Sequence, residues 1–123
     1  LKDLPVSSIK TAVTPACWIS LACRNSNELN EGTPLQDALQ TIRELDPQAQ
    51  HVHAIGINCC DIAHVPSLLQ IIVQDMATSG PRRGIALYPN SGEEWDANNE
   101  TWTKGTGCIV TDEFANRLLE AYH

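Results

Sequence analysis

Three apolar runs of the sequence each end in thiol, amide or hydroxyl side chains. These side chains are the candidate functional groups of the chain, because thiols can bind metals and amides and hydroxyls can bind a polar substrate. Cys23 ends the first run, Asn58 and Cys59 end the second, and Asn90-Ser91 follows the third. In sheets of parallel strands, functional residues gather at the carboxyl ends of the strands. If the three runs are parallel strands, these side chains form one polar mouth at an edge of the sheet.

The cysteine spacing leaves the role of Cys59 open. The chain has five cysteines, Cys17, Cys23, Cys59, Cys60 and Cys108. Their odd number and irregular spacing indicate free thiols or a metal site rather than a disulfide framework. A free cysteine is most often a small buried hydrophobic residue, and no Cys-x-x-Cys or His-Glu-x-x-His pattern marks a metal site here.

Hydrophobic patterning predicts the elements that position this mouth. Strands are predicted at residues 17–23, 52–59 and 84–88, and each is followed by apolar residues at helical spacing. This order, repeated three times, predicts an α/β fold with parallel strands and right-handed crossovers. Periodicity alone allows either a small open sheet or a part of a (β/α)₈ barrel.

The first helix has the clearest boundary signals. Thr33 is predicted as its N-cap, with Pro34 at the first helical position and Gln36 completing a capping box. Asp46-Pro47 is predicted to end it. Its buried face is predicted to consist of Leu35, Ala38, Leu39, Ile42 and Leu45.

Length and charge argue against several classes of protein. The 123 residues suffice for one domain, and 42% hydrophobic with 19% charged residues is typical of globular proteins. A net charge of −7 disfavours nucleic-acid and anionic-membrane partners, and no apolar run reaches the ~18–20 residues of a membrane span. No secretory leader is visible at Leu1, so we expect a cytoplasmic location.

Two motifs carry a resemblance to a known family. They are Gly56-Ile57-Asn58-Cys59 and Tyr88-Pro89-Asn90-Ser91-Gly92-Glu93, preceded by Trp18-Ile19-Ser20 and Glu31-Gly32-Thr33-Pro34-Leu35. In this order they resemble the homocysteine S-methyltransferases, which are zinc-dependent (β/α)₈ barrels. The similarity is closest to fungal or plant forms of the branch that uses S-methylmethionine or S-adenosylmethionine.

The resemblance implies that residues 1–123 are a partial homocysteine-binding domain supplying about three β/α units, strands five to seven, of a (β/α)₈ TIM barrel. The family's Gly-Gly-Cys-Cys segment and its early acidic residues have no counterpart among these residues. We therefore expect a C-terminal fragment of a methyltransferase that is inactive by itself and binds zinc weakly.

The resemblance also implies the site. Cys59 would be one of three zinc-binding thiolates, the other two belonging to the missing Gly-Gly-Cys-Cys, with the fourth position left for the sulfur of homocysteine. The partners are then homocysteine and a sulfonium methyl donor. Asn58, Asn90 and Ser91 are assigned to the amino-acid end of the substrate, and no residue is assigned as a catalytic acid or base.

Two other functions stay open at this stage. The segment could be a non-catalytic binding or regulatory module, or a thiol redox protein built around Cys59 and Cys60. The redox hypothesis gives no role to the motif at residues 88–93. Because side chains alternate faces along a strand, only one of the two thiols can point into the mouth, and Cys60 is predicted to pack near the following turn or helix.

The remaining histidines and tryptophans have simpler interpretations. His51, His53 and His64 flank the cysteine strand, but their positions are more typical of surface or packing residues than of metal ligands. Trp95 and Trp102 lie on a predicted polar loop. We expect them to anchor that loop, with contact to a sulfonium cation as the alternative.

Overall fold

The computed structural model describes residues 15–107 and 111–122 of the chain. The elements, in chain order, are β1 (Cys17–Ala22), α1 (Leu35–Leu45), β2 (Val52–Asp61), the 3₁₀ helix η1 (Ile62–His64), α2 (Val65–Thr78), β3 (Gly84–Asn90), β4 (Trp95–Asp96), β5 (Thr101–Trp102) and α3 (Thr111–Tyr122). Cys108 lies outside the described residues.

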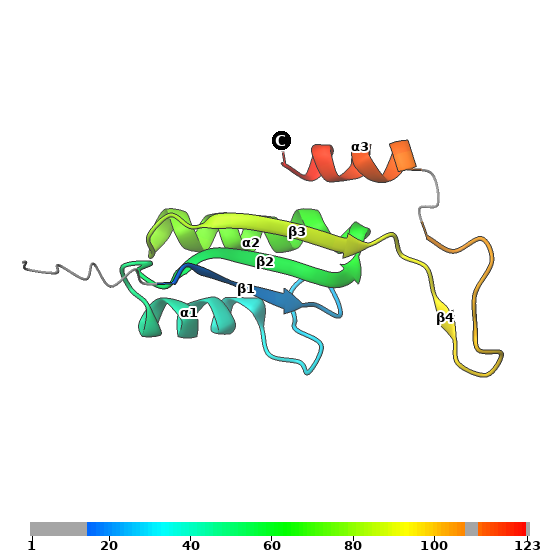
Figure 1. The fold of residues 1–123 in the computed structure, drawn as a ribbon, viewed down its shortest axis with the longest axis horizontal. Coiled ribbons are helices and arrows are strands. Elements are labelled where there is room, and N and C mark those ends of the chain that lie inside the picture. The colour runs from blue at the N-terminus through cyan, green and yellow to red at the C-terminus, as the bar shows by residue number, and fades with distance from the viewer. Residues whose placement is uncertain (1–14, 108–110, 123) are drawn as a thin grey trace, which may run out of the picture.

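The three main strands form one parallel sheet with β2 in the middle (Figure 1). Their carboxyl ends share one edge, where Ala22, Asn58 and Tyr88 are aligned across the sheet. The predicted α/β arrangement of parallel strands is therefore confirmed. A closed barrel needs more strands than these three.

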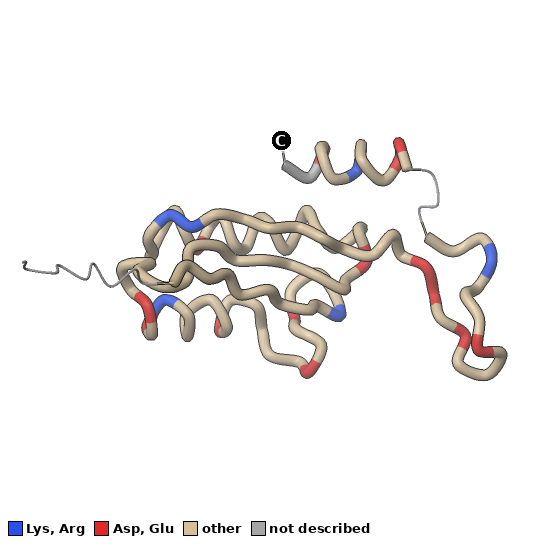
Figure 2. Tube along the Cα trace, viewed as in Figure 1, with Lys and Arg blue, Asp and Glu red and all other residues tan. Residues whose placement is uncertain are grey.

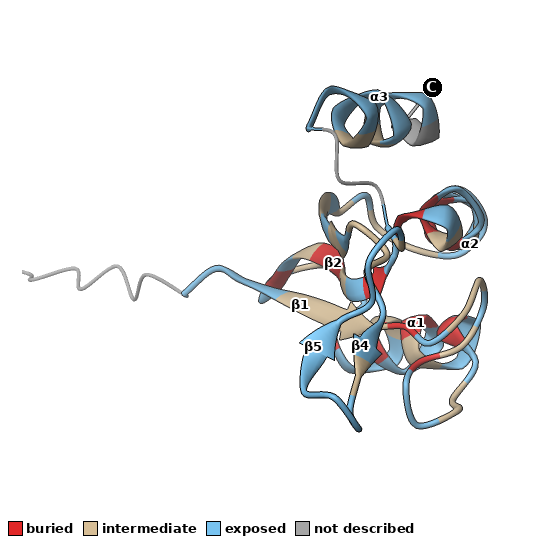
Figure 3. Cartoon of the chain, turned by 90° about the vertical axis from the view of Figure 1, so that its right-hand side faces the viewer, coloured by how far each residue is buried: buried red, intermediate tan, exposed pale blue. Residues whose placement is uncertain are grey.

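Helices cover one face of this sheet. Figure 3 shows α1 and α2 on the same side of the strands, and Ile55 and Ile57 of β2 are buried against them. The helical residues of this core are Leu35, Leu39, Ile42, Val65, Leu68, Leu69 and Ile72. Phe114 and Leu118 of α3 pack against the same core. None of the described helices is long and apolar enough to cross a membrane.

The opposite face of the sheet carries small and aromatic side chains, and no described helix packs on it. Trp18 and Tyr88 are exposed there, and the Trp18 indole Nε1 donates a hydrogen bond to the Tyr88 hydroxyl at 3.1 Å. Between them the strands carry Ser20, Ala54, Gly56 and Ala86. The two faces thus differ in character: one is the hydrophobic core, the other a shallow and partly polar surface.

The start of α1 differs from the prediction. The helix begins at Leu35 after Pro34, and no side chain caps it, so the predicted Thr33 cap is wrong. The loop after β1 folds back instead, and the Leu35 N–H donates to the Asn27 carbonyl at 2.8 Å. The Asn27 carbonyl thus takes the place of a side-chain cap, because it accepts one of the free N–H groups of the first helical turn. Leu45, predicted to be buried, is 81% exposed in the last turn.

The segment after β3 contains a β-hairpin rather than only a polar loop. β4 and β5 pair antiparallel, with Trp95 opposite Trp102. Their rings meet edge to face, with centroids 5.2 Å apart. Cross-strand aromatic pairs of this kind stabilise short hairpins. The prediction that the tryptophans anchor this segment is therefore confirmed.

Candidate functional site

The carboxyl edge of the sheet brings together the residues that the sequence singled out. Asn58 lies beside Tyr88, and Asn90 lies opposite Asp61 at the end of the neighbouring strand. Cys59 is exposed at this edge. The predicted mouth of polar groups is therefore present at the ends of β2 and β3, but Cys23, which was predicted to belong to it, is 2% exposed and lies in the core instead.

The two neighbouring cysteines point to different sides of β2. The backbone of Cys59 has a φ of 51°, a left-handed conformation that is uncommon outside glycine, and the pairing with β3 is irregular between Asn58 and Asp61. As a result Cys59 is exposed, whereas Cys60 is 3% exposed and belongs to the core. The prediction that Cys60 is a packing residue is confirmed, and this arrangement gives a redox pair of Cys59 and Cys60 no support.

Burial sets the acidity of the inner thiols. Burial, with smaller contributions from the nearby Cys23 and Asp61, raises the pKa of the Cys60 thiol to about 11. Burial, followed by the charge of Glu31, also raises the pKa of Cys23. Both inner thiols therefore stay protonated and unreactive at neutral pH. Cys59 is the exposed thiol of the strand-end site.

Asn58 connects the sulfur of Cys59 to the neighbouring strand. Its amide Nδ2 donates to Cys59 Sγ at 3.2 Å, and its Oδ1 accepts a hydrogen bond from Ser20 Oγ at 3.0 Å. The sequence motif that contains Ser20 gave this residue no role in the site. The alternation of faces was the available signal, because it places Ser20 on the same face of β1 as Ala22 at the strand end. In the structure Ser20 lies opposite Gly56 of β2.

The loop after β3 is folded tightly against the end of β2. Gly92 has a φ of 93°, and a Cβ placed on it would lie 3.2 Å from the Asp61 carboxylate oxygens. Beside it, the Ser91 hydroxyl donates to the Glu93 carboxylate. Ser91 therefore lies at the mouth with its hydroxyl already bonded, close in sequence to Asn90 at the end of the strand.

The described residues do not bring a full set of metal ligands together. Within residues 15–107 and 111–122, no three His, Cys, Asp or Glu side chains group closely enough to hold a metal. His51 and His53 are exposed near the other end of β2, and His64 Nδ1 is hydrogen-bonded to Ser26 at 3.0 Å. Their interpretation as surface or packing residues is confirmed. An exposed thiol that accepts an amide N–H suits a thiolate ligand, so Cys59 fits as one member of a larger set.

Charge is distributed unevenly around the mouth. Residues 93–104, on the strand-end side, carry four acidic residues and one lysine. Figure 2 shows this run of acidic residues along the segment that follows β3. Such a segment favours a cationic over an anionic ligand near the mouth.

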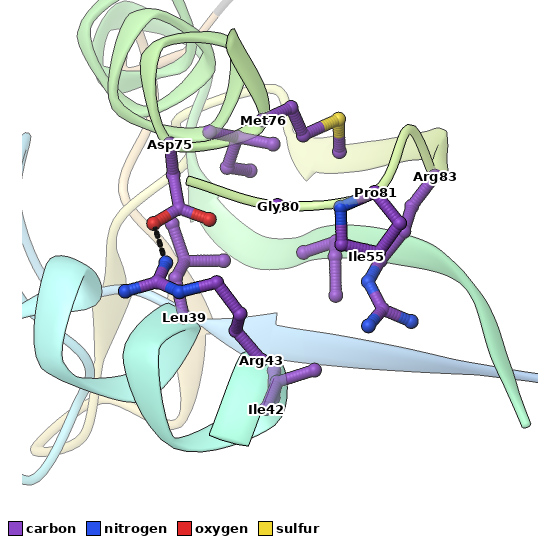
Figure 4. A pocket seen from close by; sticks show the side chains of 10 residues that line it. Leu39, Ile42, Arg43, Ile55, Asp75, Met76, Gly80, Pro81 and Arg83 are labelled. Carbon is purple, nitrogen blue, oxygen red and sulfur yellow. Dashed lines mark hydrogen bonds and ion pairs between the residues drawn. The ribbon is translucent and has the colours of Figure 1, made fainter. Parts of the chain in front are cut away.

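The small cavity between α1 and α2 is not a substrate site. Leu39, Ile55 and Ile72 are among its lining residues, and the ion pair of Arg43 with Asp75 lies across it (Figure 4). Its volume of about 10 Å³ is close to that of a single water. It also lies against the amino-terminal half of β2, on the face away from Asn58.

Comparisons with known proteins match most of the chain. The family model described as homocysteine S-methyltransferase matches residues 4–118. Homocysteine S-methyltransferase YbgG of Bacillus subtilis strain 168 is 35% identical over 91 residues, which are 74% of this chain and 26% of the relative. Homocysteine S-methyltransferase of Escherichia coli K12 is 38% identical over 85 residues, 69% of this chain and 24% of the relative.

A relative with a different named substrate also matches. Selenocysteine methyltransferase of Astragalus bisulcatus is 31% identical over 101 residues, 82% of this chain and 26% of the relative. The chain thus spans about a quarter of the length of the curated relatives it matches. No solved structure matches it significantly.

Proposed function

Because the chain belongs to the homocysteine S-methyltransferase family, we propose that it supplies part of the active site of an enzyme that methylates homocysteine to methionine. The methyl donor is a sulfonium compound, S-methylmethionine or S-adenosylmethionine. The observation that carries the proposal is the exposed Cys59 at the carboxyl edge of the sheet, one strand away from Asn90-Ser91.

The reaction is a displacement at carbon. The sulfur of homocysteine forms a bond to the methyl carbon while the bond from that carbon to the sulfonium sulfur breaks. The thiol proton passes to solvent, and the donor leaves as a neutral thioether. Because a free thiol with a pKa near ~8.5 is mostly protonated at neutral pH, the enzyme must favour the thiolate form of homocysteine.

Cys59 fits a zinc ligand in this scheme, together with two thiolates of the family's Gly-Gly-Cys-Cys segment, which residues 1–123 lack. Zinc bound by three thiolates supplies a Lewis acid with an open position that keeps a substrate thiol deprotonated. Cys59 itself contributes negative charge and an exposed sulfur at the strand end. Cys60 contributes packing only.

The amide and hydroxyl groups of the mouth are proposed to bind the amino-acid end of the substrate. Asn58 and Asn90 end neighbouring strands, and Ser91 follows at once. The acidic segment at residues 93–100 favours the positive charge of a sulfonium donor. These residues orient the substrate. They do not distinguish S-methylmethionine from S-adenosylmethionine, because both are sulfonium compounds.

The proposed architecture is three consecutive units of a (β/α)₈ barrel. In such barrels helices cover the outside, and strand residues of alternate position point inward. The helix-covered face and the opposite face with Ser20, Gly56 and Asn58 fit the outside and the inside of this arrangement. The shared carboxyl edge then corresponds to the face where barrel enzymes place their active sites.

A hybrid enzyme tests the proposal. The segment of the Escherichia coli relative that this chain matches is replaced by the corresponding residues of this chain, which restores the rest of a full-length enzyme around Cys59. We expect bound zinc near one equivalent and methyl transfer from S-methylmethionine to homocysteine. Cys59→Ala should abolish both, because the site loses one of its three thiolates.

Cys60→Ala in the same hybrid is the matched control. It removes an adjacent thiol that faces the core, so zinc content should stay near one equivalent, with a modest loss of stability. If Cys60→Ala removes the zinc while Cys59→Ala retains it, the site assignment is wrong. Chain 1–123 without the hybrid partner should show no methyl transfer and only weak zinc binding, because one thiolate does not make a three-thiolate site.

A further inference from the structure

We propose that Ser20 is a positioning residue of the strand-end site: through its hydroxyl it holds the Asn58 amide so that an N–H donor stays on the sulfur of Cys59. The proposal deepens the proposed function, since its consequence for the reaction rests on Cys59 being the functional thiol. The hydrogen bonds that carry it are present in the chain whatever that function is.

The Asn58 amide is held at both ends. Ser20 Oγ donates to Asn58 Oδ1 at 3.0 Å, and Asn58 Nδ2 donates to Cys59 Sγ at 3.2 Å. The hydroxyl comes from β1, 38 residues earlier in the chain, whereas Asn58 and Cys59 are neighbours on β2. Without Ser20, the amide would be held only at the sulfur end, and its terminal torsion has a broad, roughly two-fold profile that permits rotation.

Gly56 makes room for this arrangement. It lies directly opposite Ser20 in the sheet, and a Cβ placed on it would be 2.9 Å from Ser20 Oγ and 3.1 Å from Ser20 Cβ. Real Cβ atoms do not approach other heavy atoms that closely, so a larger residue at position 56 would displace the hydroxyl. The glycine of the Gly-x-Asn-Cys motif therefore preserves the position of Ser20.

The chemical effect of this chain of bonds falls on the sulfur. The amide N–H orients the Cys59 sulfur, and a hydrogen bond of this kind is roughly twice as strong to an ionised acceptor as to a neutral one. An amide nitrogen carries two protons and Cys59 takes one, so this role is compatible with a substrate contact by Asn58. Partners that orient a metal ligand in this way typically change metal affinity by about 10–100-fold when removed.

NMR of the ¹⁵N-labelled chain tests the hydrogen bonds directly. We expect the two side-chain amide protons of Asn58 to have well-separated chemical shifts, with one of them exchanging slowly with solvent. Ser20→Ala should reduce this separation and speed exchange of the slow proton by about 5-fold, which corresponds to the ~1 kcal/mol of a lost hydrogen bond. Ser20→Thr keeps the hydroxyl, so it should restore the native pair.

Two further variants make the result specific. Ser26→Ala removes a hydroxyl of the loop after β1 that is hydrogen-bonded to His64 of η1, and it should leave the Asn58 protons unchanged. Cys59→Ala changes an exposed position, so the chain stays folded, and it should release the slow Asn58 proton by removing its acceptor. The proposal is overturned if the Asn58 protons are unaffected in a folded Ser20→Ala chain, or if the slow proton persists in Cys59→Ala.

The zinc-loaded hybrid separates this proposal from the proposed function. Ser20→Ala should speed the loss of zinc to a chelator by about 10-fold, with Ser20→Thr near the parent rate. If the parent hybrid binds no zinc, the proposed function fails while the NMR result still decides the role of Ser20. If zinc is bound but its loss is unchanged in Ser20→Ala, the positioning role toward the metal ligand is refuted.

Discussion

Arg83 and Asp46 form a buried ion pair that ties together the amino-terminal ends of two strands. Arg83 Nη1 lies 3.1 Å from Asp46 Oδ2, and the two side chains are 5% and 8% exposed. The Asp46 carboxylate also accepts backbone N–H groups of Gln50, His51 and Val52 at 2.8–3.2 Å. The Val52 N–H, before the other partners, holds the pKa of Asp46 well below its usual range. This cluster fixes the connection from α1 to β2 at the edge opposite the candidate site.

Replacing Asp46 should therefore destabilise the fold without touching the site. Asp46→Asn keeps the shape but removes the charge that compensates the buried Arg83, and breaking one partner of a buried pair is strongly destabilising. We expect a clearly lower urea midpoint at pH 7. Glu44→Gln is the control, because Glu44 is exposed two residues earlier and its carboxylate accepts a hydrogen bond from Gln40 on the helix surface. Equal midpoints for the two variants would contradict the structural role of Asp46.

Alkaline pH should weaken the fold through Cys60. Because the pKa of this thiol is raised from an ordinary 9.0 to about 11 in the folded chain, the unfolded chain loses the proton first as pH rises. The contribution of Cys60 to stability is thus fully present below pH 9 and is lost between about pH 9 and pH 11. The cost is at most about 1.4 kcal/mol per pH unit. Urea unfolding at a series of pH values should show a smaller alkaline slope for Cys60→Ala than for the parent, and an unchanged slope would refute this.

Alkylation should distinguish the thiols by their exposure. Iodoacetamide at pH 8 should modify Cys59 and Cys17, both exposed, at least about 10-fold faster than Cys23 and Cys60, which react only when the core opens. Peptide mapping by mass spectrometry assigns the modified positions. In 8 M urea, a condition chosen to unfold the chain, the difference should disappear. Fast native modification of Cys60 would show that the register at the end of β2 is wrong.

The hairpin segment should be sensitive to a methyl group at Gly107 but much less so at Gly105. Both glycines have positive φ, 77° and 82°. A Cβ on Gly107 would lie 2.7 Å from the Glu93 backbone nitrogen, whereas a Cβ on Gly105 meets nothing within 4 Å. Gly105→Ala should cost only the conformational penalty of about 1 kcal/mol, and Gly107→Ala about 1–3 kcal/mol more.

Hydrogen exchange at Thr103 measures the effect locally. The Thr103 N–H donates to the Glu94 carbonyl at 2.8 Å, so displacement of the segment around Glu93 should expose it. Its exchange should be fastest in Gly107→Ala and intermediate in Gly105→Ala. The same exchange rate in both variants would mean that the close approach of Gly107 to Glu93 does not hold the loop in place.

The sequence by itself determined the order and type of the main elements. Apolar runs and helical spacing are local patterns, so they located β1, β2, β3 and the helices between them, and the repeated strand–helix order required parallel pairing. The motif at residues 56–59 likewise pointed to the strand end and to the family. The zinc ligand, the substrate contacts and the cytoplasmic location stay predictions.

Tertiary structure alone decided which groups meet at the strand ends. The left-handed backbone of Cys59, the Asn27 carbonyl that replaces a Thr33 cap, and the pairing of Trp95 with Trp102 depend on contacts between distant segments. The same is true of Ser20 and Asn58, which are 38 residues apart, and of Asp46 and Arg83, which are 37 apart. Local propensities do not encode such pairs, because their energies arise only when the sheet and its helices have brought the two chain segments together.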